Sequence, residues 1–239
     1  ALFASPFAAL AATPITFLAV PPLMAEEASY KLEVKDFTEL KVLNSINIEY
    51  HCSADSAGWA YFDCEPEVAS RLMFSNNKSR LQIEIADPEL PISGLPTIKV
   101  YSTLLDKVEN SGDSLVRINN DIAVKEFKAT LIGNGQLVVK GLSANKLNAT
   151  IAAGNGQLVI SGKTRSAKLK NVGTGTVECA DLAAEDVNAW LFGSGPIDCN
   201  ASESLTVYGA GSGKVYYGTK PEKISNRSMG VKILDANAR

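Results

Sequence analysis

The chain has 239 residues, of which 46% are hydrophobic and 21% are charged, and its formal net charge is −3. This composition is typical of a globular protein and provides enough chain for one large domain or two small ones. The slight negative charge, without any cluster of basic residues along the sequence, argues against a nucleic-acid-binding protein.

The first 25 residues are mostly small and apolar, and prolines interrupt them repeatedly. Two interpretations stay open for this segment. It is either the remnant of a secretory signal ending before Glu26, or an extended strand that caps the domain or pairs with a neighbouring molecule. The prolines argue against a membrane-spanning helix. We therefore separate residues 1–29 from one domain over residues 30–239.

Residues 30–96 have an irregular β pattern. Apolar and polar residues alternate over 30–50 and again over 81–85, which predicts strands. The polar residues 51–63 predict a loop in a hairpin centred near Gly58. Cys52 and Cys64 flank this loop, so a disulfide across the hairpin is expected.

From residue 97 on, the chain repeats a glycine-rich motif every 18 to 21 residues. The clearest copies begin at Gly133 and Gly154, with Gly-Asn-Gly-Gln-Leu-Val in both. The fourth and sixth residues after the first glycine are mostly apolar, which is the period of a strand. A fixed period near 20 is typical of a solenoid, in which each repeat buries its apolar face on its neighbours. The looser copies begin at Gly112, Gly173, Gly193, Gly211 and Gly230.

Each repeat also has a second apolar cluster, such as residues 147–151, so at least two strands are expected per turn. A turn of about 20 residues with two strands leaves no room for helices. The sequence therefore predicts an all-β parallel β-helix, with residues 30–96 as its irregular N-terminal β cap and first strands. The glycines mark corners, where the backbone needs positive φ or close approach.

Cys179 and Cys199 occupy the same column in successive repeats. Stacked Cα atoms about 5 Å apart fit a disulfide, and two buried free thiols are the alternative. An even number of cysteines favours an oxidising, exported setting. Their spacing does not suggest zinc, and we expect no metal site and no cofactor.

Four aromatic residues are candidate ligand-binding residues: Trp59 and Tyr61 in the loop region, and Trp190 and Tyr216 in the repeats. Exposed aromatic rings on a flat β surface suit sugars or a protein partner, whereas a role in the core or cap is the alternative.

Acidic and basic residues gather on one connection of the repeats. A β-helix enzyme that acts on polysaccharides would need a carboxylate cluster with a nearby basic residue. Mixed charges on a solvated face explain the same pattern. The residues concerned are Asp181, Glu185 and Asp186, with Lys168 and Lys170 one repeat earlier.

Residues 34–48, residues 81–85 and the ladder of Gly-Asn-Gly and Gly-Ser-Gly repeats carry a more specific signal. With these features the chain resembles the bacterial head GIN domain, labelled "putative auto-transporter adhesin", over about residues 30–235. The resemblance implies a right-handed β-helix in an exported protein that is periplasmic, outer-membrane-associated or secreted. The family defines no catalytic residues, so none is carried over.

The leading hypothesis is a non-enzymatic adhesin or envelope binding module that binds a polysaccharide or a surface protein, and not nucleic acid. The alternatives are a carbohydrate-active β-helix enzyme and a purely structural envelope module. Self-association through the ends of the β-helix or the apolar N-terminus is also expected. A groove with three or more carboxylates and a Lys or Arg would favour the enzyme.

Overall fold

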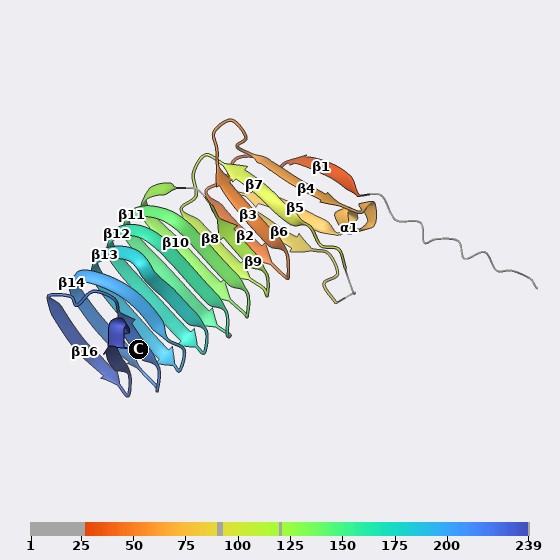
Figure 1. Cartoon of the computed structure of the whole chain (residues 1–239). Coiled ribbons are helices and arrows are strands. Elements are labelled where there is room, and N and C mark those ends of the chain that lie inside the picture. Colours follow the sequence, from red (N-terminus) through yellow and green to blue (C-terminus); the bar gives the residue numbers. More distant parts are fainter. Residues whose placement is uncertain (1–26, 90–92, 120, 239) are drawn as a thin grey trace, which may run out of the picture.

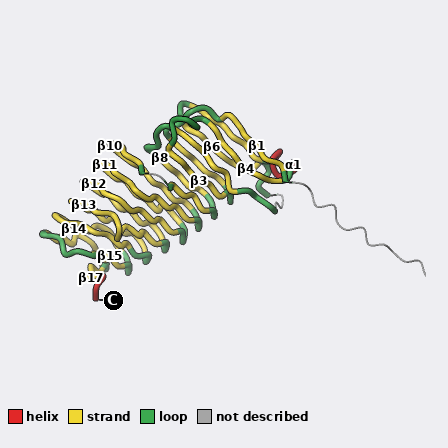
Figure 2. Tube along the Cα trace, turned by 45° about the horizontal axis from the view of Figure 1, so that its top comes forward, coloured by secondary structure: helices red, strands yellow, loops and turns green. Residues whose placement is uncertain are grey.

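The computed structural model describes residues 27–89, 93–119 and 121–238 (Figure 1). The expectations for residues 1–26 therefore lie outside the described residues. Strands dominate, and the described helices are α1 (Pro66–Ser70) and the short 3₁₀ helix η1 (Ala236–Ala238). The strands stack in one direction into an elongated molecule (Figures 1 and 2).

The C-terminal half of the chain forms regular coils. The strands here are β8 (Lys107–Ser111), β9 (Leu115–Ile118), β10 (Ile122–Ile132), β11 (Gln136–Ala153), β12 (Gln157–Gly173), β13 (Thr176–Gly193), β14 (Ile197–Ala210), β15 (Lys214–Tyr217), β16 (Lys223–Met229) and β17 (Lys232–Asp235). Neighbouring coils pair in parallel, and Leu137 of β11 lies beside Leu158 of β12. The predicted β-solenoid with about 20 residues per turn is confirmed.

Each full coil has three paired stretches rather than the two strands that the sequence suggests at a minimum. In β11 these are residues 136–139, 142–144 and 146–151. The register shifts between the first two stretches, and Asn145 is left out of the pairing between the last two. The chain changes direction at both points, so that one long strand wraps around most of a turn.

The N-terminal part adds seven strands: β1 (Ala28–Glu33), β2 (Glu39–Leu43), β3 (Asn47–Cys52), β4 (Trp59–Cys64), β5 (Leu72–Asn77), β6 (Arg80–Ile85) and β7 (Thr97–Ser102). Here β2 pairs in parallel with β8, and β3 pairs in parallel with β9, so both continue the solenoid. In contrast, β1, β4 and β5 pair antiparallel with their neighbours. This mixture is the irregular β cap that the sequence predicts.

The expected hairpin around Gly58 is wrong in two respects. Most of the C-terminal half of the predicted loop is strand β4, with Ala60 and Phe62 buried. Strands β3 and β4 are also not partners, because β7 lies between them and pairs with both. Cys52 lies beside Ser102 at one end of β7, whereas Cys64 lies beyond its other end. A Cys52–Cys64 disulfide does not form in this arrangement, and both thiols are free.

The core is filled by columns of inward-facing residues with complementary sizes. One column contains Phe127, Leu147, Ala167, Val187 and Leu205 in successive coils. The column two residues further on contains Ala129, Ala149, Leu169, Ala189 and Val207. Large residues in one column face small ones in the other in most coils, which keeps the volume of each coil similar and the interior close-packed.

Glycines are required at the corner before the first stretch. The first glycine of each repeat from Gly133 to Gly230 has a positive φ between 83° and 148°. At Gly193 an added Cβ would lie 2.2 Å from the carbonyl oxygen of Gly173 in the preceding coil. The corners therefore depend on close stacking of backbone on backbone, which a side chain would prevent.

An ion-pair cluster joins the cap to the coils. The Nε of Arg80 donates to Glu39 Oε2 at 2.8 Å, and Lys107 Nζ lies 3.3 Å from the same oxygen. The three residues lie on β6, β2 and β8, which are neighbouring strands. The Arg80 hydrogen bond, together with Lys107, holds the pKa of the Glu39 carboxyl below its ordinary value.

This lowered pKa gives a pH-dependent prediction. The stabilisation by the Glu39 carboxylate is fully present above its unfolded pKa and is lost as the pH falls through the lower folded pKa. We expect Glu39→Gln to destabilise the protein at pH 7 by less than about 1 kcal/mol, because the cluster is partly exposed. The difference from the wild type should shrink progressively as the pH falls below about 4. Thermal unfolding across pH measures it, with Glu33→Gln on β1 as control, and an unchanged difference at low pH would contradict it.

The C-terminal end of the solenoid has open strand edges. Among the described residues, β16 pairs with β14 and β17 pairs with β15, and neither has a partner on its outer side. Exposed apolar side chains lie on both strands, at Ile224, Met229 and Leu234. Self-association through this end stays a prediction.

Candidate functional site

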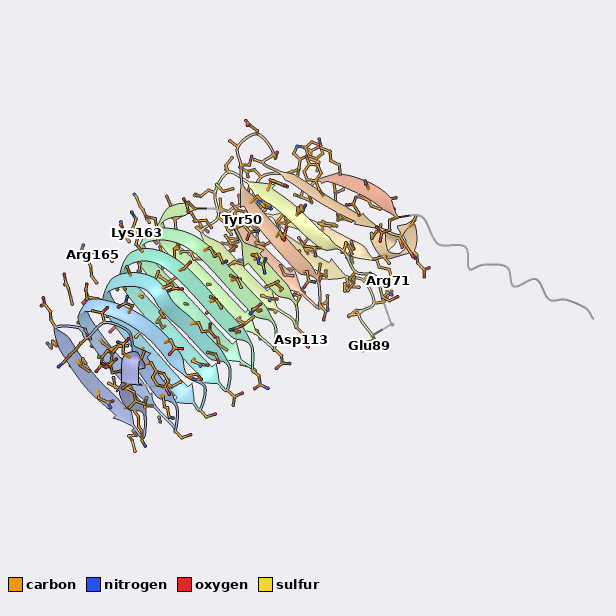
Figure 3. The ribbon with its side chains drawn as sticks, in the orientation of Figure 1. Tyr50, Arg71, Glu89, Asp113, Lys163 and Arg165 are labelled. Atoms are coloured by element: carbon orange, nitrogen blue, oxygen red, sulfur yellow. The ribbon has the colours of Figure 1, made fainter. Side chains whose placement is uncertain are left out.

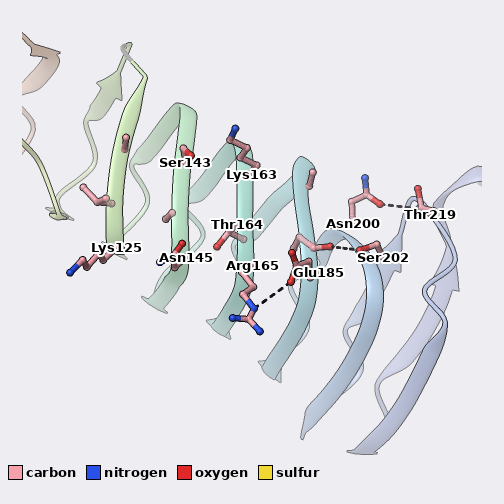
Figure 4. A pocket seen from close by; sticks show the side chains of 15 residues that line it. Lys125, Ser143, Asn145, Lys163, Thr164, Arg165, Glu185, Asn200, Ser202 and Thr219 are labelled. Carbon is pink, nitrogen blue, oxygen red and sulfur yellow. Dashed lines mark hydrogen bonds and ion pairs between the residues drawn. The ribbon is translucent and has the colours of Figure 1, made fainter.

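A groove crosses five successive coils on one side of the solenoid, from β10 to β14 (Figure 4). Its volume is about 870 Å³. Neighbouring strands lie about 4.8 Å apart, so four steps between five strands give a length of about 19 Å. Asn200, Ser202 and Thr219 line its C-terminal end. The groove therefore runs along the solenoid axis and has similar residues at each coil.

The groove follows the corner between the second and third stretches of each coil. Its floor consists of small or β-branched residues that occupy one column: Val124, Ala144, Thr164 and Ala184. The last three are at most 8% exposed, whereas their neighbours on both sides are more exposed. Because the floor side chains are short, the two flanking columns stand above them and form walls.

Charged residues lie on both walls. Lys163 projects on one side with Ser143, and Lys125, Asn145 and Arg165 lie on the other (Figure 4). Figure 3 shows Lys163 and Arg165 extending from the surface of the coils. The Nε of Arg165 lies 3.4 Å from Glu185 Oε2 in the next coil.

Sequence reasoning did not assign Lys125, Lys163 or Arg165 to a site. The cations are separated by up to 40 residues in the chain, and the fold brings them to one corner. A signal was available, because Lys125, Asn145, Arg165 and Glu185 each precede the second apolar cluster of their repeat by two residues. Extending the repeat register to that column would have aligned them.

Trp59 and Tyr61 come together on β4. The Nζ of Lys31 lies 4.2 Å from the centre of the Trp59 ring and 5.6 Å from that of Tyr61. Tyr61 packs edge-on against Tyr101, which stacks on His51 at 5.1 Å. These contacts form an aromatic cluster on the N-terminal part of the molecule, and binding of a ligand there stays a prediction.

Trp190 and Tyr216 lie on different stretches of the coil. Trp190 stacks on Tyr208 at 4.5 Å, with Lys168 at 5.0 Å from the Trp190 ring and Arg227 at 5.9 Å from the Tyr208 ring. The two rings thus occupy a continuous stack across coils, which stabilises the sheet surface. Tyr216 is on β15, beside Asp198, so the structure does not bring the four predicted aromatic residues into one site.

The predicted cluster of Asp181, Glu185 and Asp186 is only partly in the groove. Glu185 lines it, whereas Asp186 forms a hydrogen bond with Ser204 on the outer surface of β14. Within the described ranges, no group of three or more His, Cys, Asp or Glu residues is placed to hold a metal ion.

Cys179 and Cys199 are register partners on β13 and β14, which confirms that they share a column. Both side chains are buried and both thiols are free. Burial raises the pKa of Cys179, and it raises the pKa of Cys199 to about 12. Since the thiolate is the reactive form, these thiols are chemically quiet near neutral pH. A disulfide between them stays a prediction.

The stacked coils define the class of protein: a parallel β-solenoid with an open groove along its axis. The chain belongs to the family described as "Putative auto-transporter adhesin, head GIN domain", whose model matches residues 36–221. The description of the family points to an extracellular or envelope location and to adhesion at a surface. None of the helices described is long and apolar enough to cross a membrane.

Solved structures share the fold at low sequence identity. A putative adhesin from Bacteroides fragilis is 23% identical, with a TM-score of 0.78 over 88% of this chain and 96% of that chain. A putative adhesin from Parabacteroides distasonis is 18% identical, with a TM-score of 0.72 over 88% and 98%. A structure named a putative lipid binding protein, from the same species, is 18% identical, with a TM-score of 0.66 over 88% and 97%. Comparison with curated proteins gives no match.

Proposed function

We propose that the protein is a non-enzymatic adhesin of the cell envelope or its exterior that holds an extended polysaccharide in the groove across β10 to β14. The observation that carries this proposal is the groove itself, which crosses five coils. A chain molecule lying along the solenoid axis would contact equivalent positions in successive coils. The family description supports a role in adhesion.

The lining of the groove suits a sugar chain. Hydroxyl and amide side chains, at Ser143, Asn145 and Thr164, alternate with small apolar ones such as Ala144 and Ala183. Hydroxyl and amide groups both donate and accept hydrogen bonds, as sugar hydroxyls require. The distance of about 4.8 Å between strands is close to the length of one sugar unit in an extended chain.

The carboxylates of the groove favour binding over hydrolysis. Glycoside hydrolases ordinarily use a pair of carboxyl groups on either side of the bond that breaks. Glu185 is the one carboxylate among the lining residues that the structure describes, and it is ion-paired with Arg165. This lining does not meet the requirement for three or more carboxylates that would favour the enzyme.

Blocking the groove tests the proposal. Ala183 lines the groove on β13, and Ala180 is an exposed alanine of the same strand that does not line it. We expect Ala183→Trp to lower retention on a polysaccharide, chosen from a glycan array, by about tenfold or more, because the indole fills the groove. Ala180→Trp should bind as the wild type does.

The same assay distinguishes the alternatives. Equal retention of both tryptophan variants would place binding outside the groove and overturn the proposed site. Release of shortened sugar chains from the bound polysaccharide would overturn the non-enzymatic role. If no glycan is retained by the whole chain, binding of a surface protein or a purely structural role would replace the proposal.

A further inference from the structure

The charge of the groove is opposite in sign to that of the chain. The whole sequence has a formal net charge of −3. The groove is lined by three cationic residues, Lys125, Lys163 and Arg165, and one anionic residue, Glu185, so three minus one leaves a charge of +2. A groove lined mainly by cations attracts anionic ligands, even in a protein whose net charge is negative.

The two lysines are available to a ligand. Both side chains are exposed, and among the described residues no carboxylate lies within ion-pair distance of either one. Arg165 and Glu185 are 77% and 50% exposed, so their ion pair is weak and easily screened. An anionic ligand can therefore replace Glu185 as the ion-pair partner of Arg165 at a small cost in free energy.

The positive charge continues onto the surface beside the groove. Lys168 and Arg227 lie on the outward face of the third stretch, where they contact the Trp190 and Tyr208 rings. Lys170 belongs to the same face, as the register partner of Trp190. These cations extend the favourable potential beyond the groove along the coils.

We propose that the occupant of the groove is an acidic polysaccharide, with a carboxylate on most sugar units, whose chain lies along the solenoid axis. This inference rests on the proposed function and adds the chemical class of the ligand. Lys125 and Arg165 stand in one column two coils apart, or about 10 Å. Carboxylates on alternate sugars of an extended chain fall at a similar interval, and Lys163 reaches the chain from the opposite wall.

Two other polyanionic partners fit the groove less well. Proteins that bind single-stranded nucleic acid stack bases on aromatic side chains, and no aromatic residue is among the described groove residues. A membrane surface is bound by exposed apolar side chains beside basic ones. The large exposed apolar side chains of the described chain, such as Met73 and Met229, are not among the groove residues.

Polygalacturonate and its fully methyl-esterified form provide a matched pair of probes, because they share a backbone and differ in charge. We expect the whole protein to bind the acidic form about tenfold more tightly at low salt, and the difference to shrink as sodium chloride rises toward 0.5 M. Equal binding of both forms would overturn the acidic ligand and leave the polysaccharide function standing. If neither form is retained, the acidic ligand is overturned as well. Binding of other glycans on the array then decides whether the polysaccharide function survives.

Variants that remove a positive or a negative charge from the groove test which residues contact the ligand. Lys163→Gln is expected to weaken binding of polygalacturonate about two- to fivefold, and Glu185→Gln is expected to strengthen it by a similar factor, because it removes the competitor for Arg165. Lys214→Gln removes the same charge from β15, outside the groove, and should leave binding unchanged. Weakening by Glu185→Gln, or an equal effect of both lysine variants, would overturn the proposal. If a single-stranded oligonucleotide displaces the protein from polygalacturonate at a lower concentration of negative charges than free polygalacturonate does, nucleic acid would be favoured as the ligand instead.

Discussion

Replacing Gly193 with alanine is expected to lower the free energy of unfolding by about 3 kcal/mol or more. Gly193 has a φ of 145°, which L side chains rarely adopt, and its Cβ would lie 2.2 Å from the carbonyl oxygen of Gly173. The obstructing atom belongs to the backbone of the preceding coil, so relief requires that two coils move apart. Urea denaturation followed by circular dichroism measures the change.

The matched control for this substitution is Gly218→Ala. Gly218 follows β15, its φ is not positive, and the nearest atom to an added Cβ is 4.0 Å away. Its free energy of unfolding should change by less than about 0.5 kcal/mol. If Gly193→Ala and Gly218→Ala unfold at the same urea concentration, the stability of the fold does not depend on close backbone stacking at the Gly193 corner.

Truncation of Phe127 to alanine is expected to cost about 3–5 kcal/mol. The Phe127 ring is fully buried at the centre of β10, next to Leu147 of the following coil, and the buried residue two positions further along the strand is the small Ala129. The column next to Phe127 contains the small residue Ala129 in this coil. No large neighbouring side chain of the coil can therefore move into the space that the ring leaves. The cavity therefore stays largely unfilled.

Phe192→Ala is the control, because Phe192 is 42% exposed at the end of β13. It should cost less than about 1 kcal/mol, and Phe127→Leu should fall between the two. Equal stabilities for the two alanine variants in thermal unfolding would show that the interior tolerates the loss of a ring, contrary to the packing described above.

The repetitive part of the fold was predictable because its determinants are local and periodic. The glycines and the two apolar columns recur every 18 to 21 residues, and pairing between neighbouring repeats follows from that spacing alone. The shared column of Cys179 and Cys199 is one such inference, and the register confirms it. The sequence predicts at least two strands per turn, and it does not identify the third stretch because residues 142–144 contain only Leu142 as a large apolar residue.

The N-terminal part was harder because its pairings are not local. Strand β7 lies between β3 and β4 although it comes later in the chain, and nothing in residues 47–64 indicates it. The groove was missed for a related reason. Its cations are far apart in the sequence, and the repeat register has to be extended to the column before the second apolar cluster before Lys125 and Arg165 align at one corner.

The parallel stacking of coils also determines how the molecule responds to mechanical load. The hydrogen bonds between parallel strands connect each coil to the next, and they therefore run roughly along the solenoid axis. Tension applied between the N-terminal cap and the groove is carried in series by the interfaces between the coils that separate them, so the interface with the shortest paired stretches opens first. Long strands pair along most of a coil between β11 and β12, whereas β2 and β3 of the cap meet β8 and β9 through short stretches only. If the proposed ligand pulls on the groove, we expect the molecule to extend at the junction with the N-terminal cap while the groove keeps its shape.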